Sequence, residues 1–277
     1  MANVTTTTAA KMIAEKWTRK IEKPFYNAIY FADLVTRRDE LVSDGGNKIN
    51  IPFLSSYNAR DKASGTAVTY DANTETEIEL SINKHKYLAF VIEDIVKVQS
   101  NYNMQEAYRG AQTESLARAM DSDLAGLHAS AGTNVAGGAT VDDADILSVV
   151  LALDLANVPQ TDRHGIVAAK VMNDLRSVNK YSAYDQTGKT GVAVSGGAMI
   201  PSVYGMDLHM SNNVVDDTTN THSLFFHKSA ISLAVQLKPT YKAEDSVDEI
   251  GLKFVLHTIY GFAVERSAAL VDLERAS

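Results

Sequence analysis

The sequence predicts an α+β protein, because three kinds of segment follow one another along the chain. Residues 78–95, IELSINKHKYLAFVIEDI, alternate apolar and other side chains as an extended strand does. A segment from Tyr102 has apolar residues at helical spacing over about 28 residues, or ~42 Å at about 1.5 Å per residue. The remainder mixes short helices and antiparallel strands without a βαβ repeat.

The composition is that of a globular protein and excludes several chemistries. Of 277 residues, 45% are hydrophobic and 22% are charged, and the formal net charge is −8. An acidic chain lacks the basic surface of proteins that bind duplex DNA. Cysteine is absent, which excludes disulfides, thiolate metal sites and cysteine nucleophiles. We find no signal-peptide core and no apolar run of about 18 residues, so we expect a soluble protein made in a cytoplasm, with no membrane partner.

The N-terminal part is expected to contain two short helices. Residues 9–22 have helical spacing, and Pro24 ends that helix or begins the next turn. A dense aromatic cluster follows, which we expect to form a short helix with buried rings. Its members are Phe25, Tyr26, Ile29, Tyr30, Phe31 and Leu34.

Two strands and an irregular tip form a predicted long hairpin. Residues 47–54, NKINIPFL, follow a Gly-Gly turn and place alternate apolar side chains on one face. Residues 55–75 are small and polar and show no period, and loops of that length are usually functional or disordered. The second strand, within residues 78–95, would reach about 50 Å at about 3.3 Å per residue, whereas an ordinary strand has roughly 5–6 residues.

The long helix precedes a mixed unit. Its predicted buried stripe is Leu116, Met120, Leu124 and Leu127. Charged residues, among them Asp121 and Asp123, occupy mainly other positions. Asp142 or Asp143 is expected to cap the next helix. The apolar residues of that helix are Ile146, Leu147, Val150, Leu151 and Leu153.

Strands dominate the predicted C-terminal half. The expected elements are a buried strand at 165–173, a short helix at 173–184, a Gly-rich loop at 186–205, a strand at 206–214, two strands within 222–238, one or two strands within 251–265 and a short strand within 267–277.

No candidate group has the spacing of a catalytic or metal site. The histidines are His85, His128, His164, His209, His222, His227 and His257, and none forms a tight ligand pair. Two S-x-x-K matches, at Ser81 and Ser177, lack their partner motifs. The glycines of residues 188–197 match no phosphate-binding pattern. Asp216 and Asp217 lie in a loop without the remaining calcium ligands. We therefore expect no enzyme activity, no cofactor and no metal.

The order of these parts resembles the major capsid protein of tailed bacteriophages, which has the Hong Kong 97 phage coat fold. DLVTRRDELVSDGGNKINIPF is similar to the start of the family's extended loop, and VMNDLRSVNKY to a strand-to-helix step. IPSVYGMDLHMSNNV is similar to a recurring stretch, here with Gly205, Leu208, Ser211 and Asn212. FFHKSAISLAVQ and YGFAVERSAALVDL resemble the last strands. The resemblance covers about residues 20–275.

The resemblance implies a division of the chain and a function. The implied parts are an N-terminal arm (1–44), an extended β-hairpin loop (45–95), a peripheral domain with a long spine helix (96–140) joined by a late strand from about 236–260, and a mixed α/β axial domain (141–235 and 261–277). The implied function is a structural subunit of an icosahedral phage head. It would self-assemble through hexamers and pentamers into a shell that encloses double-stranded DNA without sequence-specific binding.

Further partners and a place in the cell follow from the same resemblance. We expect a separate scaffolding protein, because no fused scaffolding segment is visible, together with a portal protein and, in some shells, a decoration protein. The location would be the virion, after synthesis in the host bacterial cytoplasm. The alternatives are the shell of a bacterial nanocompartment with the same fold, another phage head or tail protein, or an enzyme.

The arm is the predicted contact between subunits. Its length does not allow both faces to be buried on its own domain, so we expect its apolar face to cover a neighbour, a heterologous contact that builds a closed shell when repeated. The alternative is a hairpin folded back onto its own core. The predicted interface residues are Arg60, Asp61, Lys62, Ile78, Leu80, Ile82, Lys84 and Lys86.

Overall fold

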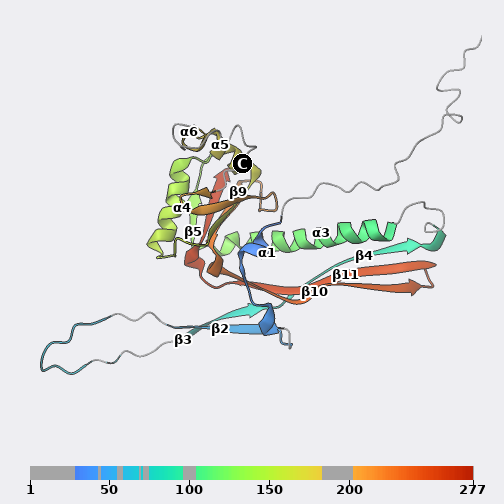
Figure 1. Ribbon diagram of the computed structural model, residues 1–277, viewed down its shortest axis with the longest axis horizontal. Helices are drawn as coiled ribbons and strands as arrows, with labels where there is room; N and C mark the ends of the chain where they lie inside the picture. The colour runs from blue at the N-terminus through green and yellow to red at the C-terminus, as the bar shows by residue number, and fades with distance from the viewer. Residues whose placement is uncertain are drawn as a thin grey trace, which may run out of the picture.

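The protein consists of a compact α/β unit from which a helix and two β-hairpins extend, as Figure 1 shows. The computed structural model describes residues 29–42, 45–54, 59–68, 70, 75–95, 104–182 and 202–276. The helix expected at residues 9–22 and most of the Gly-rich loop expected at 186–205 lie outside the described residues.

A six-stranded sheet forms the centre of the compact unit. Its strand order is β5 (Thr133–Ala136), β12 (Leu270–Ala276), β9 (Asn220–His227), β6 (Arg163–Val167), β8 (Met206–Met210) and β7 (Ser202–Val203). Two of its pairs, β5 with β12 and β6 with β8, are parallel. The chain reaches β8 from β6 through α5 (Ala169–Ser177) and α6 (Asn179–Ser182), a parallel crossover that the sequence did not predict.

The strand expected at 165–173 is therefore shorter than predicted. Strand β6 ends at Val167, and α5 buries Val171, Met172 and Leu175 at helical spacing. A short apolar run is ambiguous between strand and buried helix, and here the chain changes from one to the other within that run.

Helix α4 (Asp143–Leu155) begins at the predicted cap. The Asp142 side chain accepts hydrogen bonds from the backbone N–H groups of Ala144 and Asp145, and the Asp145 carboxylate accepts one from the Asp142 N–H. Only some of the apolar residues of this helix are buried. Its buried residues are Ile146, Val149 and Leu153, whereas Leu147 and Leu151 are exposed. The two exposed leucines lie on the face of α4 that does not pack on the sheet.

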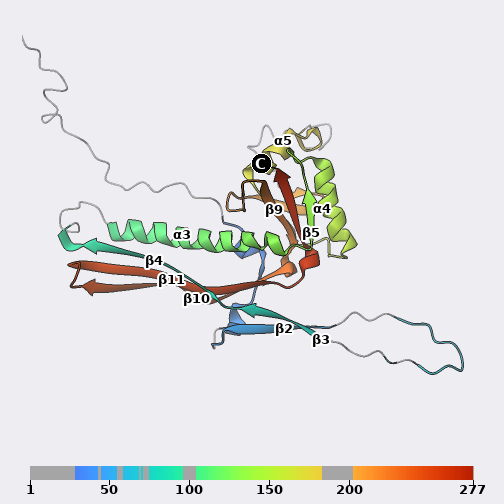
Figure 2. The same cartoon turned by 180° about the vertical axis from the view of Figure 1, so that it is seen from behind.

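The long helix is α3 (Met104–Ala125), which lies along a second, four-stranded sheet (Figure 2). The order in this sheet is β1 (Thr36–Arg37), β10 (Ile231–Ser246), β11 (Gly251–Val264) and β4 (Lys84–Glu93). The α-helix is shorter than expected, because a 3-10 turn, η3 (Gly126–Ser130), continues the chain after Ala125. Residues 251–264 form one long strand, as one of the two predicted alternatives had it.

The predicted buried stripe of the long helix is confirmed for two of its four residues, and the other two are partly buried. Leu116 and Leu124 are buried, and Met120 and Leu127 pack against the main core. This face meets the main core through the C-terminal part of the helix, where Leu124 and Ala125 are core residues.

Asp121 departs from the predicted polar face, since it is fully buried. Its Oδ1 accepts the backbone N–H of Phe31 at 2.8 Å and that of Tyr30 at 3.3 Å, and its Oδ2 accepts from Asn213 at 3.0 Å. These bonds hold the first turn of the short helix α1 (Phe31–Leu34), whose Phe31 ring is buried as predicted. Burial raises the pKa of Asp121 although these donors oppose that shift.

The run of residues 78–95 is two strands rather than one. Strand β3 (Glu75–Ser81) pairs with β2 (Lys48–Leu54), and β4 pairs with β11 in the other sheet. The chain changes sheets at Ile82 and Asn83, where it crosses β11 so closely that a Cβ at Gly261 would lie 2.3 Å from the Ser81 carbonyl oxygen. The alternation continues across this break, which explains why the sequence reads as a single strand.

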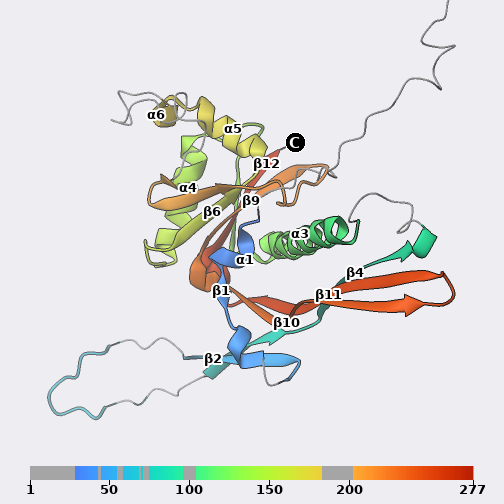
Figure 3. The same ribbon diagram turned by 45° about the vertical axis from the view of Figure 1, so that its right-hand side comes forward.

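The 3-10 helix η2 (Asp39–Val42) leads into the β2–β3 hairpin. This hairpin and the β10–β11 hairpin extend in opposite directions from the middle of the molecule (Figure 3). The remaining short 3-10 turns are η4 (Lys228–Ala230) and η5 (Ser267–Ala269).

Candidate assembly surfaces

The apolar face of the β2–β3 hairpin packs on its own chain. Ile49, Ile51 and Leu80 form a small second core with Val42 and Ala234. Phe53, Ile82 and Ala263 pack against this cluster. The base of the hairpin therefore rests on β10 and β11 of the same subunit, as in the alternative in which the hairpin folds back.

This packing corrects part of the predicted interface. Leu80 is fully buried, so its side chain is not free to cover a neighbour, whereas Ile82 packs beside it and is only partly buried. Lys86 Nζ lies 3.1 Å from Asp123 Oδ2 of α3, and Lys84 Nζ lies 5.8 Å from the centre of the Phe262 ring. These four side chains stabilise the contact between the hairpin, the sheet and the long helix.

The tip of the hairpin remains the candidate contact with other subunits. Arg60, Asp61 and Lys62 are exposed in the segment 59–68, which lies far beyond the paired strands (Figure 1). Large apolar side chains in and beside this segment are also exposed: Leu54 at 75%, Val68 at 56% and Tyr70 at 90%. Exposed apolar groups on a projecting segment are typical of binding surfaces. Ile78 is only partly exposed and lies at the base.

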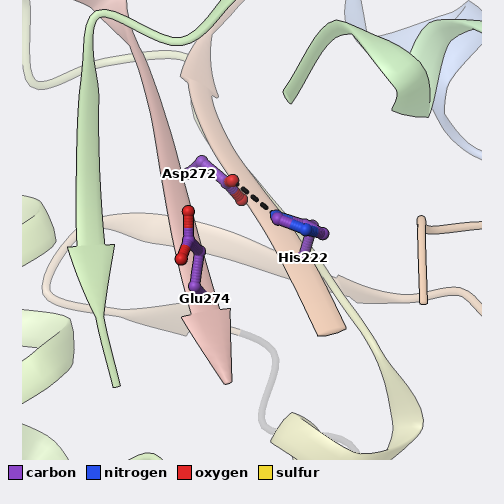
Figure 4. Close-up of side chains that lie close together, drawn as sticks. All are labelled: His222, Asp272 and Glu274. Carbon is purple, nitrogen blue, oxygen red and sulfur yellow. Dashed lines mark hydrogen bonds and ion pairs between the residues drawn. The ribbon is translucent and has the colours of Figure 1, made fainter. Parts of the chain in front are cut away.

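A cluster of polar side chains lies in the compact unit, on the strands β9 and β12 (Figure 4). His222 and Glu274 are directly opposite each other across the two strands, and Asp272 lies two residues before Glu274 on the same face. His222 Nδ1 is 2.7 Å from Asp272 Oδ2, and His222 Nε2 is 3.6 Å from Asp217 Oδ2. One ligand atom from each of His222, Asp272 and Glu274 lies within 4.8 Å of the others.

The electrostatics of this cluster favour a proton held between His222 and Asp272. Burial opposes a charged His222, but the hydrogen bond and negative charge of Asp272 outweigh it, so the pKa of His222 is raised. Burial also raises the pKa of Asp272, and the His222 hydrogen bond only partly offsets this. The sequence did not reveal the cluster, because its residues come from strands about fifty positions apart and have no motif spacing.

In the described ranges, no helix is long and apolar enough to span a membrane.

Comparisons with known proteins agree on the fold. No protein-family model and no curated protein matches the sequence. A structure from Mycobacterium phage Che8 superposes with a TM-score of 0.84 at 29% identity, covering 94% of this chain and 96% of that one. The capsid of the cyanophage P-SCSP1u gives a TM-score of 0.80 at 19% identity and covers 100% and 97% of the two chains. The mature capsid of bacteriophage PhiM1 gives 0.77 at 13% identity and covers 95% and 92%.

These likenesses extend from one end of the chain to the other, so they concern its whole architecture rather than one shared unit. They confirm the resemblance that the order of segments indicated, and this chain has the fold of phage capsid proteins.

Proposed function

We propose that this protein is the major capsid protein of a tailed bacteriophage, a structural subunit that assembles with copies of itself into the head shell. The observation that carries the proposal is the likeness over nearly the whole length of both chains to the phage Che8 structure and to a cyanophage capsid. Near-complete coverage leaves little of this chain for an added catalytic domain, so a structural role is favoured over an enzymatic one.

The parts of the Hong Kong 97 phage coat fold can be assigned to the elements described above. In this proposal, residues 1–44 form the N-terminal arm and residues 45–95 the extended loop. Helix α3 is the spine helix of the peripheral domain, within 96–140, and β10 with β11 supplies the late strands of about 236–260. The axial domain, from residues 141–235 and 261–277, holds five of the six strands of the central sheet, and the remaining strand, β5, falls within the bounds proposed for the peripheral domain. The position of α3 along β10 and β11 supports the pairing of the spine helix with the late strands (Figure 2). Strand β4, which the proposed bounds place in the extended loop, belongs to the same sheet.

The remaining parts of the proposal concern assembly. The subunits would form hexamers and pentamers of a shell located in the virion, with a separate scaffolding protein, a portal protein and, where present, a decoration protein as partners. The net charge of −8 supports a shell that encloses DNA without binding it tightly. A bacterial nanocompartment shell is the second candidate, because it would have the same fold.

Electron microscopy of the purified protein, with and without co-expressed proteins from its own genome, tests the proposal. We expect closed shells of uniform size when assembly is supported. Tubes would contradict a shell subunit, and a protein that stays monomeric under every condition would contradict self-assembly. Shells filled with an enzyme rather than DNA would favour the nanocompartment.

A further inference from the structure

We propose that His222, Asp272 and Glu274 form a binding site for a zinc ion that fastens β9 to β12. The three side chains extend from neighbouring strands onto one face of the six-stranded sheet (Figure 4). One imidazole nitrogen and two carboxylate oxygens within 4.8 Å of one another are a donor set that zinc accepts.

The carboxylate of Asp272 gives the strongest support for a bound cation. This residue is only 1% exposed, and its Oδ1 has no hydrogen-bond partner among the described residues. A buried carboxylate oxygen without a partner is costly, since it has lost water without gaining a donor. A cation beside Oδ1 and His222 would satisfy it.

The surrounding charge also favours a cation. Asp217, Asp272 and Glu274 lie around one imidazole, so the cluster is negative even when His222 carries a proton. Zinc would replace that proton and would balance two of the three carboxylates.

Neighbouring side chains already hold the proposed ligands. Asn134 and Asn220 donate to the two oxygens of Glu274 at 3.1 and 3.0 Å, and each oxygen keeps a lone pair for a metal. Such outer contacts orient the ligands of metal sites. Glu274 is the least buried of the three proposed ligands, and its bonds to Asn134 and Asn220 would have to adjust for it to take its place in a tetrahedral zinc site.

His128 of η3 lies beside the proposed site, although it is not one of the residues whose ligand atoms lie within 4.8 Å of one another. Its ring centre lies 4.1 Å from that of His222. Its Nδ1 lies 3.3 Å from the carbonyl oxygen of Ala125, a contact that favours a proton on Nδ1 and leaves the lone pair on Nε2.

Isothermal titration calorimetry on EDTA-treated, dialysed protein tests the site. We expect one zinc ion per chain, with Mg²⁺ binding far more weakly. His222→Gln and Glu274→Gln should each lower the zinc affinity at least tenfold, because each removes one ligand. His227→Gln is the matched control, since it removes another histidine of the same strand whose Nδ1 contacts Ser229 instead.

Two results would overturn the proposal: less than one zinc per wild-type chain, or unchanged affinity in both ligand variants. Circular dichroism would establish that the variants are folded. Because the two variants change different ligands, the test can still be made if one of them does not fold. Zinc binding is measured on the unassembled chain, so its absence would leave the proposed shell function unaffected.

Discussion

At the scale of single residues, His164 and His209 are a pair of histidines that resist protonation. Their ring centres are 5.9 Å apart on the neighbouring strands β6 and β8. Burial lowers the pKa of both, and the charge of His209 lowers that of His164 further. Asp207 and Asp162 oppose these shifts, and Lys228 adds to the lowering at His164.

We therefore predict that acid destabilises the subunit through this pair. In the unfolded chain the two histidines take up protons near pH 6.5, whereas in the folded chain they do so only at lower pH. Below about pH 6.5 the unfolded state binds more protons, so the free energy of unfolding falls as the pH falls. In the double variant His164→Gln/His209→Gln, thermal unfolding between pH 8 and 5 should depend less on pH. An equally steep dependence would contradict this account.

At the scale of elements, the long helix depends on one buried stripe. Leu124 is fully buried where α3 meets the main core, and Ser122 is exposed two residues earlier on the same helix. We predict that Leu124→Asp lowers the free energy of unfolding by about 3–5 kcal/mol, because an unpaired charge enters an apolar contact.

Ser122→Asp is the control for that exchange. It introduces the same charge at an exposed position, so it should change stability by only about 0.5 kcal/mol. Chemical denaturation of both variants provides the comparison. Equal stability of Leu124→Asp and the wild type would mean that the buried face of α3 is assigned wrongly.

The elements also show what the sequence could and could not predict. Local periodicity identified the buried face of α3, the cap Asp142 and the alternating faces of the hairpin, because these depend on neighbours within a few residues. It did not show that the chain changes sheets at Ile82, since the alternation is the same in both sheets. Nor did it find the pairing of His222 with Asp272, which arises only when β9 and β12 meet.

The same limit applies to side chains whose environment is set by tertiary contacts. Asp121 lies at a position that the helical pattern assigns to the polar face, yet the first turn of α1 covers it and provides its donors. Leu147 and Leu151 have the spacing of a buried stripe, yet only the other face of α4 meets the sheet.

At the scale of the whole molecule, the hairpin has two parts with different roles. Its base is part of the subunit, because Ile49, Ile51 and Leu80 are packed against β10. Its tip extends away from every other element and exposes Leu54, Val68 and Tyr70 (Figure 1). A two-stranded hairpin is only marginally stable in water, so the distal part gains most from contact with another subunit.

Removing the tip should therefore separate folding from assembly. Leu54 and Glu75 are register partners, so an Asn-Gly turn in place of residues 55–74 would close the hairpin without disturbing β2 or β3. We expect this variant to unfold at the temperature of the wild type, since the second core remains. We expect it not to form closed shells, because the proposed contact with the neighbour is gone.

Sedimentation velocity distinguishes closed shells from unassembled subunits. A second variant tests which side chains of the tip make the contact with the neighbour. Replacing Leu54, Val68 and Tyr70 by serine keeps the length of the tip but removes its exposed apolar side chains. If those side chains form the contact, this variant should also fail to assemble while remaining folded. Full-sized shells from the shortened chain would exclude the tip as the bridge between subunits. An unfolded shortened chain would mean that the subunit needs this segment for its own folding.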